Sequence, residues 1–172
     1  MKILIISGSP RKHKTDYMLN KLADGLEHSE TEFIKLSGHQ INSCLSCREC
    51  IKKPFLCQQK DDFALLREKM SGADLIIFGS PAYFDNVSAT LKNFFDRCLG
   101  LYWSEALKGK KAVLISVCGG TRVESVERTI TSMEYFCDLM KMEIIGKVGA
   151  VDDEKSKDKE LLEIAKALNL LS

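Results

Sequence analysis

The sequence predicts an α/β fold with a doubly wound parallel sheet of five strands. Short apolar runs alternate along the chain with segments of helical period, and polar loops separate the two. The runs are continuously apolar, as expected for strands that are covered on both faces. A chain of 172 residues can bury one core of this kind, so we expect a single domain over residues 1–172.

The first part of the chain supplies two strands and a long loop. Residues 2–6 are a strand, and a helical period with Thr15 as its cap follows to about residue 27. Residues 31–36 are a short second strand. About two dozen residues through Asp61 then show no regular apolar period. A loop of this length in a compact domain is usually functional or disordered.

The second part of the chain continues the alternation of helices and strands. At residues 121–124 a Thr-x-x-Glu capping box opens a long helix. The expected elements, in order, are a helix over 62–70, a strand over 74–78, a helix from 88, a strand over 111–117, a helix over 121–141, a strand over 143–151 and an amphipathic helix within 153–170.

Parallel neighbouring strands need crossover helices, and the flavodoxin-like strand order 2-1-3-4-5 fits this sequence of elements. In that order the ligand crevice lies beyond the carboxyl ends of the first and third strands. The loops over 7–14, 80–87 and 118–121 should therefore meet there.

Composition and charge exclude several classes of protein. The formal net charge is +1, so we expect no nucleic-acid partner. The apolar run at the N-terminus is too short for a signal peptide or a membrane span, and we expect a cytoplasmic protein that does not bind membranes. Seven cysteines in such a protein indicate metal or redox chemistry rather than disulfides.

The loop after the first strand suits a phosphate group, because a helix N-terminus offers unpaired N–H groups and the positive end of a dipole. Gly8 permits close approach of the backbone, and the loop matches neither a Walker motif nor a dinucleotide fingerprint. An ordinary polar turn is the alternative. Hydroxyl donors and positive charges come from Ser7, Ser9, Thr15, Arg11, Lys12 and Lys14.

Two segments together resemble the NADPH-dependent FMN reductase superfamily. The first is Gly8-Ser9-Pro10-Arg11-Lys12 followed by Thr15, and the second runs from Gly79-Ser80-Pro81-Ala82-Tyr83-Phe84 through Ser88 and Leu91-Lys92 to Asp96-Arg97. The resemblance implies an FMN phosphate at Ser7, Ser9, Arg11, Thr15 and Asp16. It implies a flavin ring at Pro81, Ala82, Tyr83, Phe84, Gly119 and Gly120. The chain departs from the family at His13-Lys14, where a Gly-Asn or similar pair is common.

The residue types support this assignment independently of the resemblance. A flavin ring needs an apolar or aromatic wall, which Tyr83 and Phe84 can supply, although either ring could instead pack into the core. Asp96 and Arg97 at a helix end are better explained by a salt bridge or a cap than by catalysis.

The cysteines at 44, 47, 50 and 57 form a compact CxxCxxCx6C pattern within a loop over about 38–60. Such a tight run is more typical of an iron–sulfur cluster than of zinc, although Gln58 stands where a ferredoxin has proline. Together with the FMN motifs, the pattern resembles the iron–sulfur flavoproteins of anaerobic archaea and bacteria. That resemblance implies a 4Fe-4S cluster on Cys44, Cys47, Cys50 and Cys57. Zinc and a metal-free loop remain alternatives, and Cys98, Cys118 and Cys137 should be buried core residues.

The leading hypothesis is an electron-transfer flavoprotein, an oxidoreductase in which FMN and the cluster carry the chemistry and no side chain is catalytic. The resemblance implies homodimers or tetramers, with the cluster of one protomer near the FMN of its neighbour and a ferredoxin or similar protein as partner. NAD(P)H or small oxidants could also react. The alternatives are an NAD(P)H-dependent FMN or quinone reductase whose loop binds zinc or no metal, and a flavin-free binding module.

Overall fold

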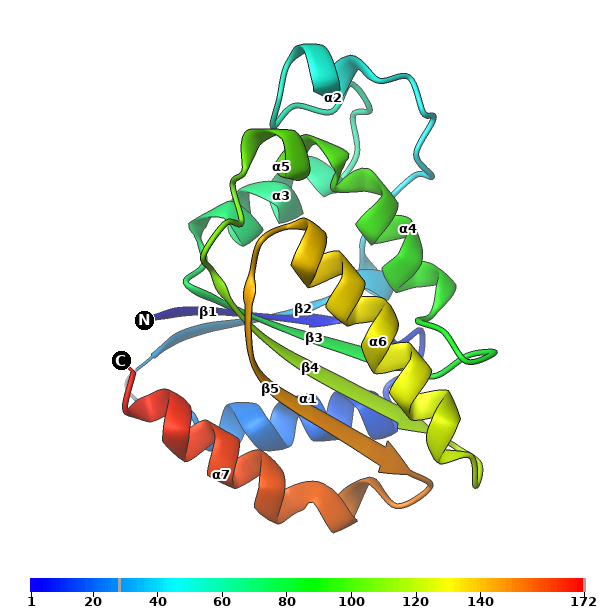
Figure 1. The fold of residues 1–172 in the computed structure, drawn as a ribbon, viewed down its shortest axis with the longest axis vertical. Helices are drawn as coiled ribbons and strands as arrows, with labels where there is room; N and C mark the ends of the chain where they lie inside the picture. Colours follow the sequence, from blue (N-terminus) through cyan, green and yellow to red (C-terminus); the bar gives the residue numbers. More distant parts are fainter. Residues whose placement is uncertain (28, 172) are drawn as a thin grey trace.

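A computed structural model describes residues 1–27 and 29–171 and confirms the predicted parallel sheet, in the order β2-β1-β3-β4-β5 (Figure 1). Every pair of neighbouring strands is parallel. The strands are β1 (Lys2–Ser7), β2 (Glu30–Lys35), β3 (Leu75–Pro81), β4 (Lys111–Cys118) and β5 (Glu143–Val151). Each overlaps the strand expected from its apolar run.

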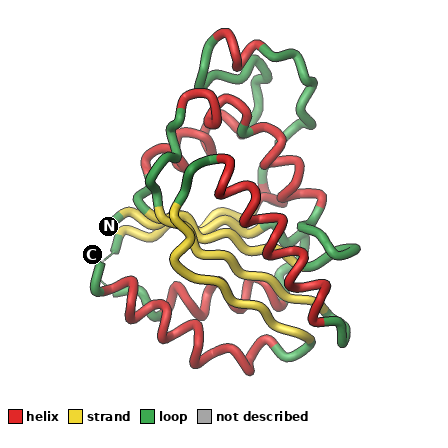
Figure 2. The backbone as a smooth tube through the Cα atoms, viewed as in Figure 1, coloured by secondary structure: helices red, strands yellow, loops and turns green. Residues whose placement is uncertain are grey.

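Helices cover both faces of the sheet, as Figures 1 and 2 show. One face carries α1 (Lys14–Asp24) and α7 (Asp158–Asn169), and the other carries α3 (Phe63–Gly72), α4 (Ala89–Arg97) and α6 (Val123–Leu139). The shorter elements are α2 (Glu49–Lys52), α5 (Leu99–Ser104) and the 3-10 turns Leu36–Gly38 and Glu154–Lys157. No helix among the described residues is both long enough and apolar enough to cross a bilayer.

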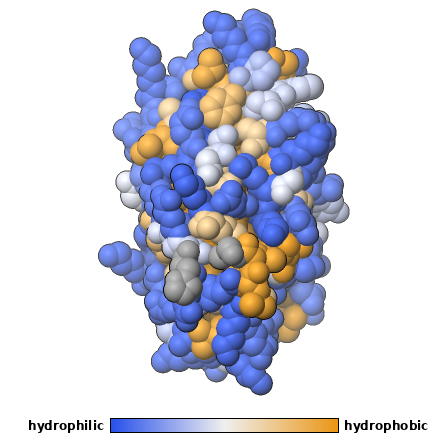
Figure 3. Space-filling model, turned by 90° about the vertical axis from the view of Figure 1, so that its left-hand side faces the viewer, coloured by the Kyte–Doolittle hydropathy of each residue, from blue (hydrophilic) through white to orange (hydrophobic). Residues whose placement is uncertain are grey.

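The core consists of two apolar layers separated by the sheet. All seven residues of β3 are buried, because the side chains of this central strand alternate between the two layers. Phe78 meets the rings of Phe95 and Phe136 edge-on, at centroid distances of 5.4 and 5.7 Å. Outside this core the surface is mostly hydrophilic, as the side view in Figure 3 shows for one face of the molecule.

Two helix starts differ from those predicted. The cap of α1 is His13 rather than Thr15, because His13 is the last residue with extended backbone. The capping box at Thr121 does not form. Arg122 is the cap of α6 and has extended backbone (φ −90°, ψ 104°), so Glu124 stands at the second helical position and cannot complete the box.

Phe78→Ala should lower the free energy of unfolding by about 3–5 kcal/mol, since it removes a fully buried ring and leaves a cavity between β3, α4 and α6. Urea denaturation of the flavin-free protein measures this change. Phe84→Ala is the matched control, because the Phe84 side chain is fully exposed and its loss should change stability by no more than about 0.5 kcal/mol. Equal effects of the two substitutions would contradict the described core.

Candidate functional site

A hollow of about 120 Å³ lies at the carboxyl edge of the sheet. It brings together the first loop with the start of α1, the end of β3 and the end of β4, as the strand order predicts. The residues that line it are Ser9, Arg11, His13, Lys14, Thr15, Pro81, Ala82, Tyr83, Val117, Cys118 and Gly119.

The first loop lies directly against the start of α4. Gly8 N donates to the carbonyl of Gly79 at 2.8 Å, and Ser88 Oγ donates to the carbonyl of Gly8 at 2.6 Å. A Cβ atom at position 8 would lie 2.6 Å from the Cβ of Leu91, so only glycine fits without displacement. Gly8 therefore ties the first loop to β3 and α4.

Ser7 and Asp16 hold this loop in place through hydrogen bonds but do not line the hollow. Ser7 Oγ donates to Asp16 Oδ1 at 2.5 Å and accepts from Ser9 N at 3.3 Å. Lys35 pairs with the other oxygen of Asp16 and also donates to the carbonyl of Arg11 at 3.0 Å. Lys35 thus neutralises a carboxylate that would otherwise repel a bound phosphate.

The lining of the first loop fits a phosphate monoester. In the first turn of α1 the N–H of Tyr17 donates to the carbonyl of His13 at 3.0 Å, and the N–H groups before it have no carbonyl of the helix to bond. The buried residues Ser9 and Thr15 add hydroxyl groups beside them, of which Ser9 Oγ donates to the carbonyl of Arg11 at 2.7 Å. Arg11 is exposed and adds positive charge. Lys14 pairs instead with Asp152 and Glu154, and its hydrogen bond to Asp152 raises the pKa of Lys14 above the ordinary value.

The end of β3 supplies a second wall of the hollow. Ala82 N donates to the carbonyl of Val117 at 2.9 Å, and Tyr83 exchanges two backbone hydrogen bonds with Asn86 around a tight turn. Tyr83 is partly exposed at 37 %, which leaves its ring accessible from the hollow. Phe84, at the tip of the turn, is fully exposed in a left-handed conformation (φ 49°) and is not part of the lining.

The β4 loop contributes fewer of the expected residues. Gly119 lines the hollow, whereas Gly120 does not. Residue-type reasoning did not identify His13 and Val117, which also line it. Their only signal in the sequence is position, since His13 lies within the predicted loop over 7–14 and Val117 directly precedes the loop over 118–121.

The four clustered cysteines line a second hollow, beside the end of α4. Cys44 and Cys47 are exposed, whereas Cys50 and Cys57 are half-buried. Burial, together with the neighbouring Cys57 thiol, raises the pKa of Cys50. Cys98 and Cys137 are buried in the core, as predicted, and burial raises the pKa of Cys137 to about 12.

The donor set of this second hollow fits an iron–sulfur cluster. Its four cysteines come without a histidine, and thiolate is the ligand that such clusters use. Within residues 1–27 and 29–171, no three cysteine, histidine or carboxylate side chains are placed to hold a single metal ion. A cluster carries its own iron and sulfide between its ligands, so the thiols need not converge on one point.

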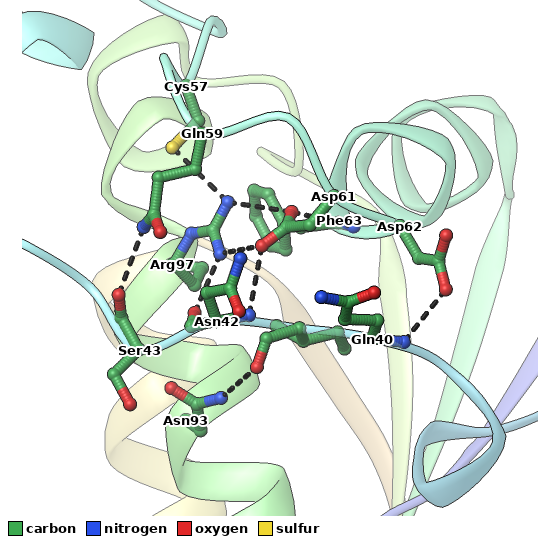
Figure 4. Close-up of polar contacts among 11 residues, drawn as sticks. Gln40, Asn42, Ser43, Cys57, Gln59, Asp61, Asp62, Phe63, Asn93 and Arg97 are labelled. Atoms are coloured by element: carbon green, nitrogen blue, oxygen red, sulfur yellow. Dashed lines mark hydrogen bonds and ion pairs between the residues drawn. The ribbon is translucent and has the colours of Figure 1, made fainter.

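Hydrogen bonds between its two ends close the cysteine loop at its base (Figure 4). Gln40 N donates to Asp62 Oδ2 at 2.8 Å, and Asn42 N donates to Asp61 Oδ2 at 2.9 Å. Closer to the cysteines, Gln59 Nε2 donates to the carbonyl of Ser43 at 3.0 Å. The base of the loop is therefore a defined structure.

Residues 1–155 match the protein family described as NADPH-dependent FMN reductase. An iron–sulfur flavoprotein of Methanocaldococcus jannaschii is 37% identical over 151 residues, which cover 85% of this chain and 76% of that protein. The chain belongs to the iron–sulfur flavoprotein family within the NADPH-dependent FMN reductases. Membership places this flavoprotein among the flavin-dependent oxidoreductases.

Other relatives agree with this placement. An iron–sulfur flavoprotein of Methanosarcina thermophila is 36% identical over 152 residues, covering 85% of this chain and 78% of that protein. One of Archaeoglobus fulgidus is 41% identical over 99 residues, which cover 56% of this chain and only 48% of that protein. Among solved structures, a flavone reductase superposes with a TM-score of 0.72 at 23% identity, over 96% of this chain and 61% of that chain. This likeness shows the shared fold.

Gly8→Ala should lower the free energy of unfolding by about 1–3 kcal/mol, because the new methyl group overlaps Leu91 at the junction of the first loop and α4. Gly38→Ala is the control, since a Cβ there meets no atom within 4 Å. Urea denaturation of the flavin-free protein compares the two. If both variants were as stable as the wild type, the close approach at Gly8 would be refuted.

Proposed function

We propose that this flavoprotein binds FMN in the first hollow and a 4Fe-4S cluster on Cys44, Cys47, Cys50 and Cys57, and passes electrons between redox partners. The observation that carries the proposal is the meeting of all four cysteines at one hollow, in a chain of the FMN reductase family. When bound, FMN supplies two-electron chemistry and the cluster supplies one-electron chemistry.

The protein's part in this chemistry is to bind and orient the cofactors. Ser9, Arg11 and Thr15 would hold the FMN phosphate together with the N-terminus of α1, and buried Ser7 and Asp16 would keep that loop in place. Pro81, Ala82, Tyr83 and Gly119 would border the ring, with Phe84 and Gly120 at its outer edge. Cys118 is buried at the same hollow.

The cysteine loop also presents a docking surface for a redox partner. Arg48, Lys52, Lys53 and Lys60 are exposed around the four cysteines, and Leu45, Ile51 and Leu56 expose apolar side chains beside them. A basic rim with apolar contacts suits an acidic protein, such as a ferredoxin. The partner would then approach the cysteine loop directly.

A contact between two copies of the chain has a separate candidate surface. A groove of about 540 Å³ runs between α4, α5 and α6, and Tyr135 and Leu139, both exposed, line it. We propose this groove as the contact in a homodimer or tetramer.

The family description supports a second candidate function, an NAD(P)H-dependent FMN or quinone reductase in which the cysteine loop binds zinc or no metal. Residues 1–155 match a family described as NADPH-dependent, and an NAD(P)H dehydrogenase (quinone) of Methanosarcina barkeri is 27% identical over 154 residues. Anaerobic oxidation of NADPH by protein shown to lack iron would favour this candidate.

Replacing Ser9 and Thr15 together by alanine should weaken FMN binding by about ten- to a hundredfold, because two hydroxyl hydrogen bonds of about 1 kcal/mol each are lost. Riboflavin, which lacks the phosphate, should bind both proteins equally weakly. Fluorescence titration of flavin-free protein measures both ligands. The exposed pair Thr31 and Ser37, replaced in the same way, is the control. An unchanged FMN dissociation constant would place the phosphate elsewhere.

Serine at Cys44, Cys47, Cys50 or Cys57 should lower cluster content while FMN is largely retained, since the two hollows share no residue. Cys98→Ser and Cys137→Ser are controls, and a hydroxyl at 98 can keep the 3.3 Å contact with the carbonyl of Phe94. Iron, sulfide and FMN per chain are measured for each variant. Full iron content in one of the four would remove that residue from the ligand set.

A further inference from the structure

We propose that Arg97 is the positioning residue of the cysteine loop: its guanidinium holds Cys57 in place and makes the bound cluster easier to reduce. The inference rests on the proposed function, because it assumes that Cys57 is a cluster ligand.

Arg97 and Asp61 form a fully buried ion pair beneath the loop. Their side chains are 0% and 1% exposed. Arg97 Nη1 donates to Asp61 Oδ2 at 2.6 Å, and Nη2 donates to Asp61 Oδ1 at 3.0 Å. This two-pronged geometry uses the guanidinium fork and fixes its orientation.

The same guanidinium contacts both sides of the loop (Figure 4). Nη1 also donates to the carbonyl of Asn42 at 2.7 Å, just before the first cysteine, and Nη2 donates to Cys57 Sγ at 3.4 Å. The ring of Phe63 lies under the guanidinium, 4.7 Å from its central carbon. Arg97 at the end of α4 thus joins the two sides of the cysteine loop and touches one proposed cluster ligand, Cys57.

A buried cation that donates a hydrogen bond to a ligand sulfur affects the reduction potential of the cluster as well as the structure of the loop. Reduction adds negative charge to a cluster, and hydrogen bonds to its sulfurs are among the factors that set its potential. The exposed lysines of the loop are screened by water and salt, whereas a guanidinium that is 0% exposed is screened much less. Asp61, the anionic member of the ion pair, opposes the stabilisation of the reduced cluster with its negative charge.

The ion pair predicts that substitutions of Arg97 and of Asp61 shift the reduction potential of the cluster in opposite directions. Arg97→Gln removes the positive charge and should shift the potential of the cluster to a more negative value. Asp61→Asn leaves Arg97 unneutralised and should shift the potential to a more positive value. A purely structural pair would not give shifts of opposite sign.

Arg67 offers a matched control. It is also a buried arginine, its guanidinium lies 4.5 Å from the ring centre of Phe55 in the cysteine loop, and it pairs with Glu68. It lines neither hollow. Arg67→Gln should therefore leave the potential at its wild-type value.

The test is a redox titration of the full chain, purified anaerobically and followed by electron paramagnetic resonance, with iron and FMN content measured alongside. At a fixed potential, Arg97→Gln should change the ratio of reduced to oxidised cluster by about tenfold, which equals about 59 mV for a one-electron couple. Arg97→Lys, which keeps the charge without the fork, should retain the cluster with a smaller shift.

Wild-type potentials in both Arg97 variants, or shifts of the same sign in Arg97→Gln and Asp61→Asn, would overturn the inference. So would an equal shift in Arg67→Gln. If Arg97→Gln loses iron but keeps FMN, the Arg97→Lys variant decides the question. A retained cluster with a lowered potential in Arg97→Lys supports the proposal. A wild-type potential or a lost cluster in Arg97→Lys refutes it. A wild-type protein without iron would refute the proposed function itself, and this inference with it.

Discussion

Helix α4 is fixed at both of its ends, and the positions of the two candidate sites depend on this. At its start Ser88 caps the helix by accepting from Leu91 N and donates to the carbonyl of Gly8, which holds the first loop. At its end Arg97 joins the two sides of the cysteine loop. A helix of nine residues is about 14 Å long, so α4 sets the spacing between the two anchor points.

Packing against the central strand keeps α4 in place. Phe78 of β3 meets Phe95 of α4, and Phe95 stacks on Phe136 of α6 at 3.8 Å. These aromatic contacts belong to the apolar layer between the sheet and α3, α4 and α6. The packing that stabilises the core therefore also holds the helix on which both sites depend. A change that moves α4 would disturb both hollows together.

Much of the fold and the general place of the sites could be predicted from the sequence, because the signals are local. Continuous apolar runs identify strands buried on both faces, and strand order then determines which loops meet. The cysteine pattern lies within 14 residues, from Cys44 to Cys57, and is visible without any tertiary information. Gly8 is predicted from the sequence to allow the backbone to approach a phosphate, whereas the structure shows a different requirement for glycine there, the close contact with Leu91 of α4.

The partner of Arg97 and the exact starts of two helices could not be predicted, because they depend on tertiary contacts and on the path of the backbone. A salt bridge was the right interpretation of Arg97, but its partner Asp61 lies 36 residues away and nothing in the spacing identifies it. The expected caps at Thr15 and Thr121 were wrong because the backbone turns into the helix at neighbouring residues, which side-chain preference alone does not decide.

The central claim is that one chain carries both FMN and an iron–sulfur cluster. Measuring iron, acid-labile sulfide, zinc and FMN in the wild-type protein after anaerobic purification tests it most directly. The account predicts about four iron and four sulfide atoms with one FMN per chain, and no stoichiometric zinc. One zinc per chain, or FMN with neither metal nor sulfide, would contradict it.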